Sequence, residues 1–295
     1  MTMNLKKFLF RYAPNFIYFR KANYVRQQWF CYKWIKKHLI WKDEFQDYQD
    51  VFNETVPLNS TVFLYWKQGW ENAPELVKKC RESIKLHCRD CKIIFLDENN
   101  LEQYLRFPEF IEKKHRNGMI NEALFSDLLR TCLLIKYGGF WCDATCFMTS
   151  SFPQWLIRES FFMFSRTLLP EYLSPIEGSN WFLKGVQNNQ LLICIRNFLF
   201  AYWKRYDFPI NYYIYHLTLA ALVNCDEQCR DIWDKKPYLC NMAPHGLMYS
   251  FSKKYSEDVF DVLASQSFIH KLTYKYDKKL TQSTEENILQ HILNL

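Results

Sequence analysis

The chain has 295 residues and a formal net charge of +7 at pH 7, a length that suits one large α/β domain or a domain with appendages. Residues 1–42 hold ten of the 38 Lys and Arg and no Asp or Glu, so the rest of the chain carries 28 basic and 31 acidic side chains. With seven glycines and no apolar run near the ~18 residues of a membrane-spanning helix, the sequence argues against a glycine-rich phosphate loop and an integral membrane protein.

Residues 1–55 form a basic and aromatic arm that we expect to be mainly helical. Its first 42 positions include twelve Phe, Tyr and Trp residues. Lys and Arg attract anionic headgroups, and Trp and Tyr favour the membrane interface, so one interpretation is contact with an anionic membrane surface or a lipid diphosphate. The alternative is a helical pair that packs on the main domain and exposes a basic rim. Because no nucleic-acid recognition module is visible, we expect no nucleic-acid partner.

The N-terminal sequence lacks the compact apolar core and cleavage site of a signal peptide. We therefore expect a cytoplasmic protein, peripheral on the inner face of the cell membrane. In that compartment the eleven cysteines are expected to be reduced thiols. Cys88 and Cys91, with Cys80 and His87 nearby, have no second pair at the spacing of a zinc ribbon, which disfavours a zinc site.

Pro57 marks the boundary between the arm and the main domain, which we place at residues 56–295. Aromatic and β-branched residues predict strands at 61–66 and 92–96. Between them, residues 74–87 predict a helix with a proline in its first turn. Asp97 closes the second strand. This β-α-β order, followed by a helix at 98–105, predicts a parallel sheet with right-handed crossovers.

Residues 121–137 predict a helix that is apolar on nearly every side. Ser126, Asp127 and Arg130 fall on one narrow stripe of this helix at 3.6 residues per turn. A buried helix needs partners or a ligand for its few charges. The stripe is therefore a candidate binding site, and the alternative is a buried intrahelical ion pair that binds nothing.

Two glycines, Gly138 and Gly139, end this helix, because glycine tolerates the left-handed backbone conformation of a helix C-terminus. The apolar strand 140–142 then leads to Asp143. Open α/β sheets bind ligands at the carboxyl ends of their strands, which makes Asp143 a second candidate. The alternative for Asp143 is an acid that caps a turn. The later elements predicted in chain order are a strand at 161–164, a structured piece at 180–182, helices at 189–206 and 212–223, a strand or loop at 268–275, and a short helix at 283–295.

The sequence SDLLR, followed by YGG and by an aromatic pair that leads to Asp143, resembles the core of the capsular polysaccharide synthesis proteins. The resemblance covers about residues 61–275. That family is related to glycosyltransferases with a DXD-type signature, among them the family-32 glycosyltransferases. The resemblance implies a GT-A-like α/β fold, in which a Rossmann-type, mostly parallel sheet is flanked by helices and carries the arm as an addition.

The resemblance also implies roles for the central residues. Asp127 and Arg130 would hydrogen-bond the hydroxyls of a donor sugar, with Ser126 near the nucleotide. Asp143 would bind a divalent cation, Mn²⁺ or Mg²⁺, because hard cations favour carboxylate oxygen. Thr145, a further candidate metal ligand, stands where the related enzymes have their second acid. Its hydroxyl is a weaker ligand than a carboxylate, so the metal either depends on another residue or has a reduced role.

Other positions follow from the same resemblance. Trp66 and Asp97 end the first two strands, where similar enzymes build a uridine pocket, and Asn180 would contact the donor sugar. His270 and Lys271 are candidates to close over the metal and the diphosphate, with His270 as a possible metal ligand. Alternation along a strand points neighbours to opposite faces, so we expect only one of the two to reach the site.

His216, in a segment that echoes the family, is a candidate for acceptor binding or acid–base chemistry, and its alternative is a core residue on an apolar helix. The function that the resemblance implies is a retaining transfer of sugar from a nucleotide-sugar, with UDP favoured, to a saccharide or lipid-linked acceptor in capsular polysaccharide synthesis.

Two alternative functions remain. One is a sugar-phosphate transferase, and the other is a non-catalytic assembly factor at the membrane surface, which the missing second acid favours.

Overall fold

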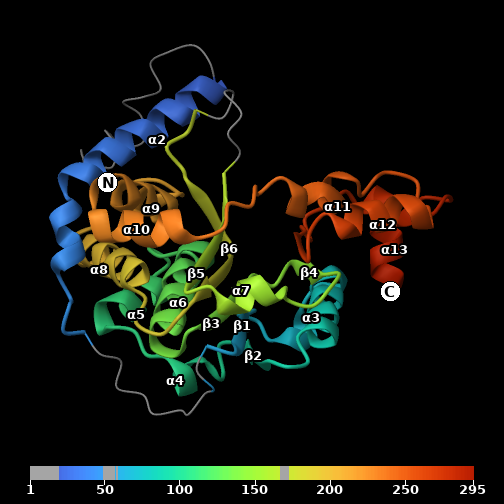
Figure 1. The fold of residues 1–295 in the computed structure, drawn as a ribbon, viewed down its shortest axis with the longest axis horizontal. Helices are drawn as coiled ribbons and strands as arrows, with labels where there is room; N and C mark the ends of the chain where they lie inside the picture. Colours follow the sequence, from blue (N-terminus) through green and yellow to red (C-terminus); the bar gives the residue numbers. More distant parts are fainter. Residues whose placement is uncertain (1–19, 49–56, 58, 167–172) are drawn as a thin grey trace.

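The computed structural model describes residues 20–48, 57, 59–166 and 173–295. Its centre is a five-stranded sheet in the order β2-β1-β3-β6-β5 (Figure 1). These strands are β1 (Thr61–Tyr65), β2 (Lys92–Leu96), β3 (Gly139–Cys142), β5 (Phe161–Ser165) and β6 (Gly178–Gly185). β1 pairs in parallel with both β2 and β3, whereas β6 runs antiparallel to β3 and to β5. Four of the five strands therefore point the same way, which confirms the predicted mostly parallel α/β fold.

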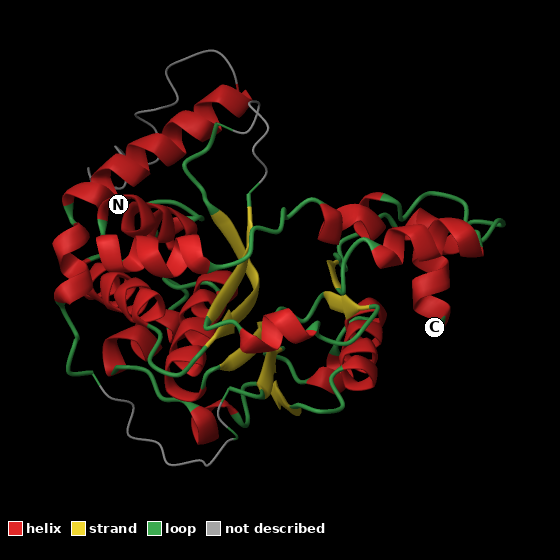
Figure 2. Cartoon of the chain, in the orientation of Figure 1, coloured by secondary structure: helices red, strands yellow, loops and turns green. Residues whose placement is uncertain are grey.

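Helices cover both faces of the sheet (Figure 2). On one face the core joins alternate strand residues to α6 (Glu122–Tyr137) and α8 (Gln190–Arg205). On the other face the core includes residues of α3 (Glu75–His87) and α7 (Gln154–Arg158). The alternation is direct in β1, where Phe63 belongs to the first core and its neighbours Val62 and Leu64 belong to the second. Strands buried on both faces explain why these segments read as continuous apolar runs.

The remaining elements complete the layers and a C-terminal lobe. They are α2 (Arg20–Lys37), η2 (Leu39–Asp43), η3 (Trp70–Asn72), α4 (Leu101–Tyr104), α5 (Glu109–Arg116), β4 (Cys146–Met148), α9 (Ile214–Cys225), α10 (Glu227–Lys235), η4 (Ala243–His245), α11 (Gly246–Tyr249), α12 (Glu257–Ser265), β7 (Ile269–Lys271), η5 (Lys278–Gln282) and α13 (Ile288–Asn294). The predicted helix at 98–105 is shorter than expected, and the helix predicted from residue 212 begins at Ile214. α13 packs on α3 and β7 pairs with β4, so the C-terminal lobe lies on the side of the sheet that α3 covers (Figure 1).

The described part of the arm packs on the main domain. α2 lies along α9, and its Cys31 and Ile35 are fully buried. The short helix η2 lies on α8, where Trp41 contacts Phe198 with 5.8 Å between ring centroids. The described part of the arm thus packs on the main domain, as the second interpretation of the arm expected. Residues 1–19 and 49–56 lie outside the described residues. Within the described ranges, no helix is both long and apolar enough to cross a membrane.

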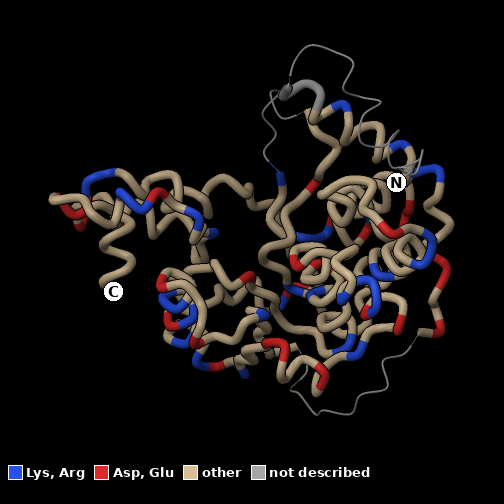
Figure 3. The backbone as a smooth tube through the Cα atoms, turned by 180° about the vertical axis from the view of Figure 1, so that it is seen from behind, with Lys and Arg blue, Asp and Glu red and all other residues tan. Residues whose placement is uncertain are grey.

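α2 leaves an exposed stripe opposite its buried side. The stripe consists of Arg26, Trp29, Phe30, Lys33 and Lys37. These positions recur every three or four residues, so they line one side of the helix. Basic residues recur along this helix (Figure 3). We call this set the basic aromatic stripe.

The close contact between β1 and β3 depends on Gly139. Its backbone has φ +94°, and a Cβ built there would lie 2.3 Å from the carbonyl oxygen of Thr61. Gly118 has a similar φ of +71°, with open space around it. A substitution at Gly118 therefore strains the backbone only, whereas the same substitution at Gly139 also crowds the neighbouring strand.

We predict that Gly139→Ala lowers the free energy of unfolding by about 3 kcal/mol or more, because the new methyl group pushes against the backbone of β1. Gly118→Ala should cost only about 1 kcal/mol, from the left-handed backbone alone. Urea unfolding followed by circular dichroism measures both values. Equal losses in the two variants would contradict the predicted contact between the strands.

Candidate active site

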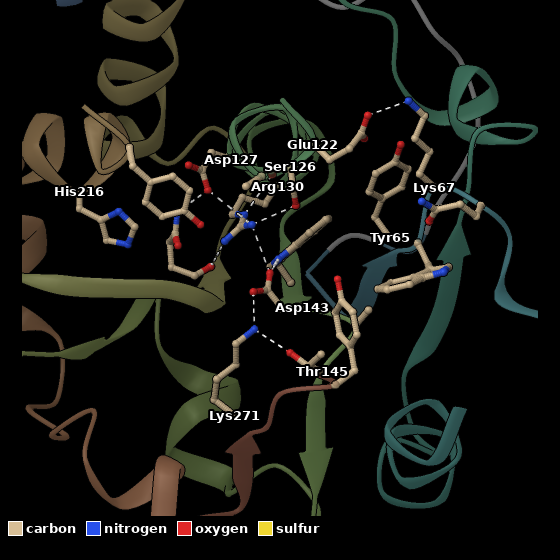
Figure 4. A pocket seen from close by; sticks show the side chains of 18 residues that line it. Tyr65, Lys67, Glu122, Ser126, Asp127, Arg130, Asp143, Thr145, His216 and Lys271 are labelled. Atoms are coloured by element: carbon tan, nitrogen blue, oxygen red, sulfur yellow. Dashed lines mark hydrogen bonds and ion pairs between the residues drawn. The ribbon is translucent and has the colours of Figure 1, made fainter. Parts of the chain in front are cut away.

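The helix α6 presents the stripe predicted from the sequence. Asn121 caps its first turn, accepting a hydrogen bond from the Leu124 N–H at 3.0 Å, and the helix ends at Gly138 with φ +66°. Most other side chains of the helix are buried in the apolar core. Ser126, Asp127 and Arg130 face a cleft at the carboxyl ends of β1 and β3 (Figure 4). The fixed ends of α6 therefore set the position of these three polar side chains.

Asp143 is held from several elements at once. Its backbone N–H donates to the Trp181 carbonyl of β6 at 2.8 Å, and the Trp141 indole donates to its Oδ1 at 2.9 Å. The same oxygen lies 3.2 Å from Arg130 Nη2 of α6. The other oxygen, Oδ2, lies 2.7 Å from Lys271 Nζ of β7. Both carboxylate oxygens are thus engaged by cations that come from distant parts of the chain (Figure 4).

Arg130 connects the stripe to β6. Its Nη1 donates to the Asn180 carbonyl at 2.5 Å, and its Nε and Nη2 donate to Ser126 at 3.0 Å. Its Nη2 also lies 3.5 Å from Asp127 Oδ1, to which the Asn180 side-chain amide donates at 2.8 Å. Its guanidinium lies 5.1 Å from the ring centroid of Trp141. The result is a buried polar network whose members fix one another's orientation.

Lys271 reaches the site through a small second sheet. β4 and β7 pair antiparallel, with Cys146 opposite Lys271, and the Leu272 N–H donates to the Thr145 carbonyl at 2.9 Å. This pairing places Lys271 Nζ within 2.8 Å of Thr145 Oγ1 as well as 2.7 Å from Asp143. The ammonium group therefore bridges the first position of the DXD-like segment and the third.

The two acids differ in their electrostatics. Burial raises the pKa of Asp127 to about 6, despite the opposing effects of Arg130 and Asn180. Burial would also raise the pKa of Asp143, but the charges of Lys271 and Arg130 together outweigh it and hold that pKa below its usual value. Asp143 is therefore a stable anion near neutral pH, while Asp127 titrates closer to the physiological range.

His216 of α9 also lines the cleft. Burial and the charge of Arg130 lower the pKa of its imidazole to about 3. Its Nδ1 is buried and has no hydrogen-bond partner among the described residues. His216 is therefore a neutral group at physiological pH, suited to hydrogen bonding or to proton acceptance and not to proton donation.

The cleft has a volume of about 420 Å³, within the range of small-molecule sites. Among the predicted site residues, the structure brings nine to its walls: Trp66, Ser126, Asp127, Arg130, Asp143, Thr145, Asn180, His216 and Lys271. Trp66 lies at one side, edge-to-face with Tyr274 at 5.4 Å between ring centroids. The central spatial expectation, that Asp143 and the stripe on α6 share one open cavity, agrees with this arrangement, while the role of each residue stays a prediction.

Two predicted residues lie outside this cleft. Asp97 uses its Oδ1 to accept the backbone N–H groups of Asn99 and Asn100 at 2.8 and 3.2 Å, so it caps the loop after β2. His270 is fully buried on the opposite side of β7 from Lys271, with Nε2 3.1 Å from the Ala264 carbonyl. The prediction that one of His270 and Lys271 reaches the site agrees with this placement, but placing His270 among the metal ligands does not.

Sequence reasoning missed several residues of the cleft: Tyr65, Lys67, Gln68, Glu122, Trp141 and Tyr274. Lys67 pairs with Glu122 at 2.6 Å in the wall of the cleft (Figure 4). Lys67 and Gln68 come two and three residues after the end of β1, so the strand-end rule that selected Asp143 after β3 selects them too. Tyr274 carried no such signal, because its position depends on the pairing of β7 with β4.

The divalent cation implied by the resemblance does not fit the side chains at this position. Around Asp143 the third residue of the motif is Thr145, whose hydroxyl is bonded to Lys271. His270 points away, and the described residues contain no group of three His, Cys, Asp or Glu side chains that could hold a metal. A hard cation selects several oxygen ligands, whereas Asp143 already faces two positive side chains.

The fold and the cleft define a mixed α/β protein with a charged site at the carboxyl ends of parallel strands. A family model described as "Capsular polysaccharide synthesis protein" matches residues 12–292, and the chain belongs to this family. The predicted resemblance is thereby confirmed. No curated protein matches the sequence. Among solved structures, one described as "PaToxG Glycosyltransferase" is 11% identical, with a TM-score of 0.38, and the match covers 72% of this chain and 84% of that chain.

The raised pKa of Asp127 predicts a pH-dependent cost to stability. Because the folded protein binds this proton more tightly than the unfolded chain, the free energy of unfolding falls as pH rises from about 4 to above about 6. We expect Asp127→Asn to gain stability relative to the wild type by about 2–3 kcal/mol between about pH 4 and pH 7.5. Asp231→Asn, an exposed change on α10, is the control. A difference between Asp127→Asn and wild type that does not vary with pH would contradict this account.

Proposed function

We propose that this protein is a glycosyltransferase that moves a sugar from a nucleotide diphosphate donor, with UDP as the favoured nucleotide, to a saccharide or lipid-linked acceptor. The observation that carries the proposal is the placement of Arg130 and Lys271 around Asp143 in an open cleft at the strand ends. Departure of a diphosphate needs positive charge close to its oxygens. Membership of the capsular polysaccharide synthesis family supports a role in building a polysaccharide.

The donor has complementary chemistry in the cleft. Asp127, Asn180 and Ser126 offer acceptors and donors for sugar hydroxyls on one side, beside the two cations. Trp66 and Tyr274 supply aromatic rings on the other side, which suits a nucleobase. This order supports a donor that lies across the cleft, with its base near Trp66 and its sugar near α6.

In the proposed step the acceptor hydroxyl oxygen bonds to the anomeric carbon while the bond from that carbon to the diphosphate oxygen breaks. The electron pair of the broken bond stays with the leaving nucleoside diphosphate, which takes the proton of the acceptor hydroxyl. The three acids that line the cleft, Glu122, Asp127 and Asp143, are each bonded to a cationic side chain. This supports a retaining front-face transfer, which needs no carboxylate nucleophile.

One end of the cleft lies toward the arm. Tyr212, which is 57% exposed, lines both the donor cleft and a second hollow whose wall includes Tyr24 of α2. Exposed aromatic rings are suited to stacking on sugars. We propose that the acceptor enters along this route and that the basic aromatic stripe of α2 holds the protein against an anionic membrane that carries a lipid-linked acceptor.

The released nucleotide tests the proposal. With UDP-, GDP- and CDP-sugars and a lipid-linked saccharide extract, chromatography should detect a nucleoside diphosphate as the product. Asp143→Asn should lower this rate by about 100-fold or more, because it frees the two cations from their fixed geometry. Asp231→Asn should match the wild type. Release of a nucleoside monophosphate would instead indicate sugar-phosphate transfer, and no release with any donor would favour a non-catalytic assembly factor.

The stripe predicts binding to vesicles that contain phosphatidylserine. Lys33→Glu with Lys37→Glu should weaken co-sedimentation by about 30-fold or more, since each surface charge contributes about 1 kcal/mol. The control is Lys278→Glu with Lys279→Glu, which makes the same charge change in the C-terminal lobe. If both double variants sediment as the wild type does, the stripe does not bind the membrane.

A further inference from the structure

We propose that the Lys271 ammonium takes the place of the divalent cation in this site, so that nucleotide binding and transfer need no metal. The inference rests on the proposed function and concerns the charge that receives the diphosphate. Its basis is the bridge from Lys271 Nζ to Asp143 Oδ2 at 2.7 Å and to Thr145 Oγ1 at 2.8 Å. A metal shared by two acids of a DXD segment would contact the same two positions.

The position of Lys271 is built into the fold. Thr145 is buried with 8% exposure, and its backbone carbonyl and side-chain hydroxyl both accept hydrogen bonds from β7 or the residue after it. The register of β4 with β7 places Cys146 opposite Lys271, which keeps the lysine beside the motif. The pairing of β4 with β7 thus already holds the Lys271 ammonium beside Asp143 and Thr145, with no loop movement needed.

The Lys271 ammonium has one hydrogen-bond donor left for a phosphate. An ammonium group has three donors, and two of the Lys271 donors have partners among the described residues. Lys271 lines the cleft, with 21% of its side chain exposed. Its third donor is therefore available to an anion that enters the cleft. Arg130, 3.2 Å from the other Asp143 oxygen, adds a second positive charge on the opposite side.

The charges of the side chains around Asp143 also favour a site without a metal. Asp127 and Asp143 face Arg130 and Lys271, so the four side chains nearest the site already neutralise one another. A divalent cation at Asp143 would meet two positive groups and would have Thr145 in place of a second carboxylate. An incoming diphosphate would instead use the remaining Lys271 donor, with no contact of Lys271 to Asp143 or Thr145 broken. Thr145 in the place of a second acid and Lys271 bonded to its hydroxyl thus both favour an ammonium group where a metal would otherwise lie.

Calorimetric titration with UDP, GDP and CDP tests the inference on the full-length protein. The wild type should bind the preferred nucleotide equally well in EDTA and in Mn²⁺. Lys271→Ala should weaken binding about 10- to 100-fold, the value of a charge-assisted hydrogen bond. Lys67→Ala, which removes another lysine of the same cleft that is paired with Glu122, should weaken binding less than Lys271→Ala does.

A double variant tests whether restoring the second acid in place of the ammonium makes nucleotide binding depend on a metal. Thr145→Asp with Lys271→Ala supplies the second acid and removes the ammonium, so its nucleotide binding should become dependent on Mn²⁺. Circular dichroism of each variant checks that the fold is retained. Wild-type binding that appears only with Mn²⁺ would overturn this inference and leave the proposed transferase intact. Failure of all three nucleotides to bind with or without Mn²⁺ would overturn the transferase proposal itself.

Discussion

The geometry of the site depends on one carboxylate, that of Asp143, held between two cations. Arg130 of α6 lies 3.2 Å from this carboxylate, and Lys271 of β7 lies 2.7 Å from it. Asp143 and Lys271 are 128 residues apart in the sequence. Removing either cation would leave a partly buried charge without its partner, which is costly in free energy. The two ion contacts therefore join the main sheet, the buried helix and the C-terminal strand at the site.

The arrangement also explains why α6 carries polar residues that its apolar surroundings do not favour. Burial raises the pKa of Asp127, so its charge at neutral pH opposes stability, and an apolar residue would pack there at lower cost. A residue that lowers stability while lining an open cleft is typical of a functional site. Asn180 and Arg130 limit the cost by hydrogen bonding, and they hold the carboxylate toward the cavity.

The sequence allowed prediction of the parts that depend on local pattern. The strands β1 and β2, the helix α6 with its glycine end, and the position of Asp143 after β3 all follow from periodicity, turn residues and the strand-end rule. The pairing of β4 with β7 did not, because a three-residue strand carries little signal and its partner lies far along the chain. Alternation showed that His270 and Lys271 diverge but not which one enters the cleft. Asp97 failed the strand-end rule because its side chain caps its own loop.

The central claim is that the Arg130–Asp143–Lys271 group receives the diphosphate of a nucleotide-sugar. A crystal structure of the protein with bound UDP tests this most directly. The account predicts diphosphate oxygens within about 3 Å of Lys271 Nζ and the Arg130 guanidinium, with the uracil ring beside Trp66. A nucleotide bound elsewhere on the molecule, with this group unchanged and facing only water, would contradict it.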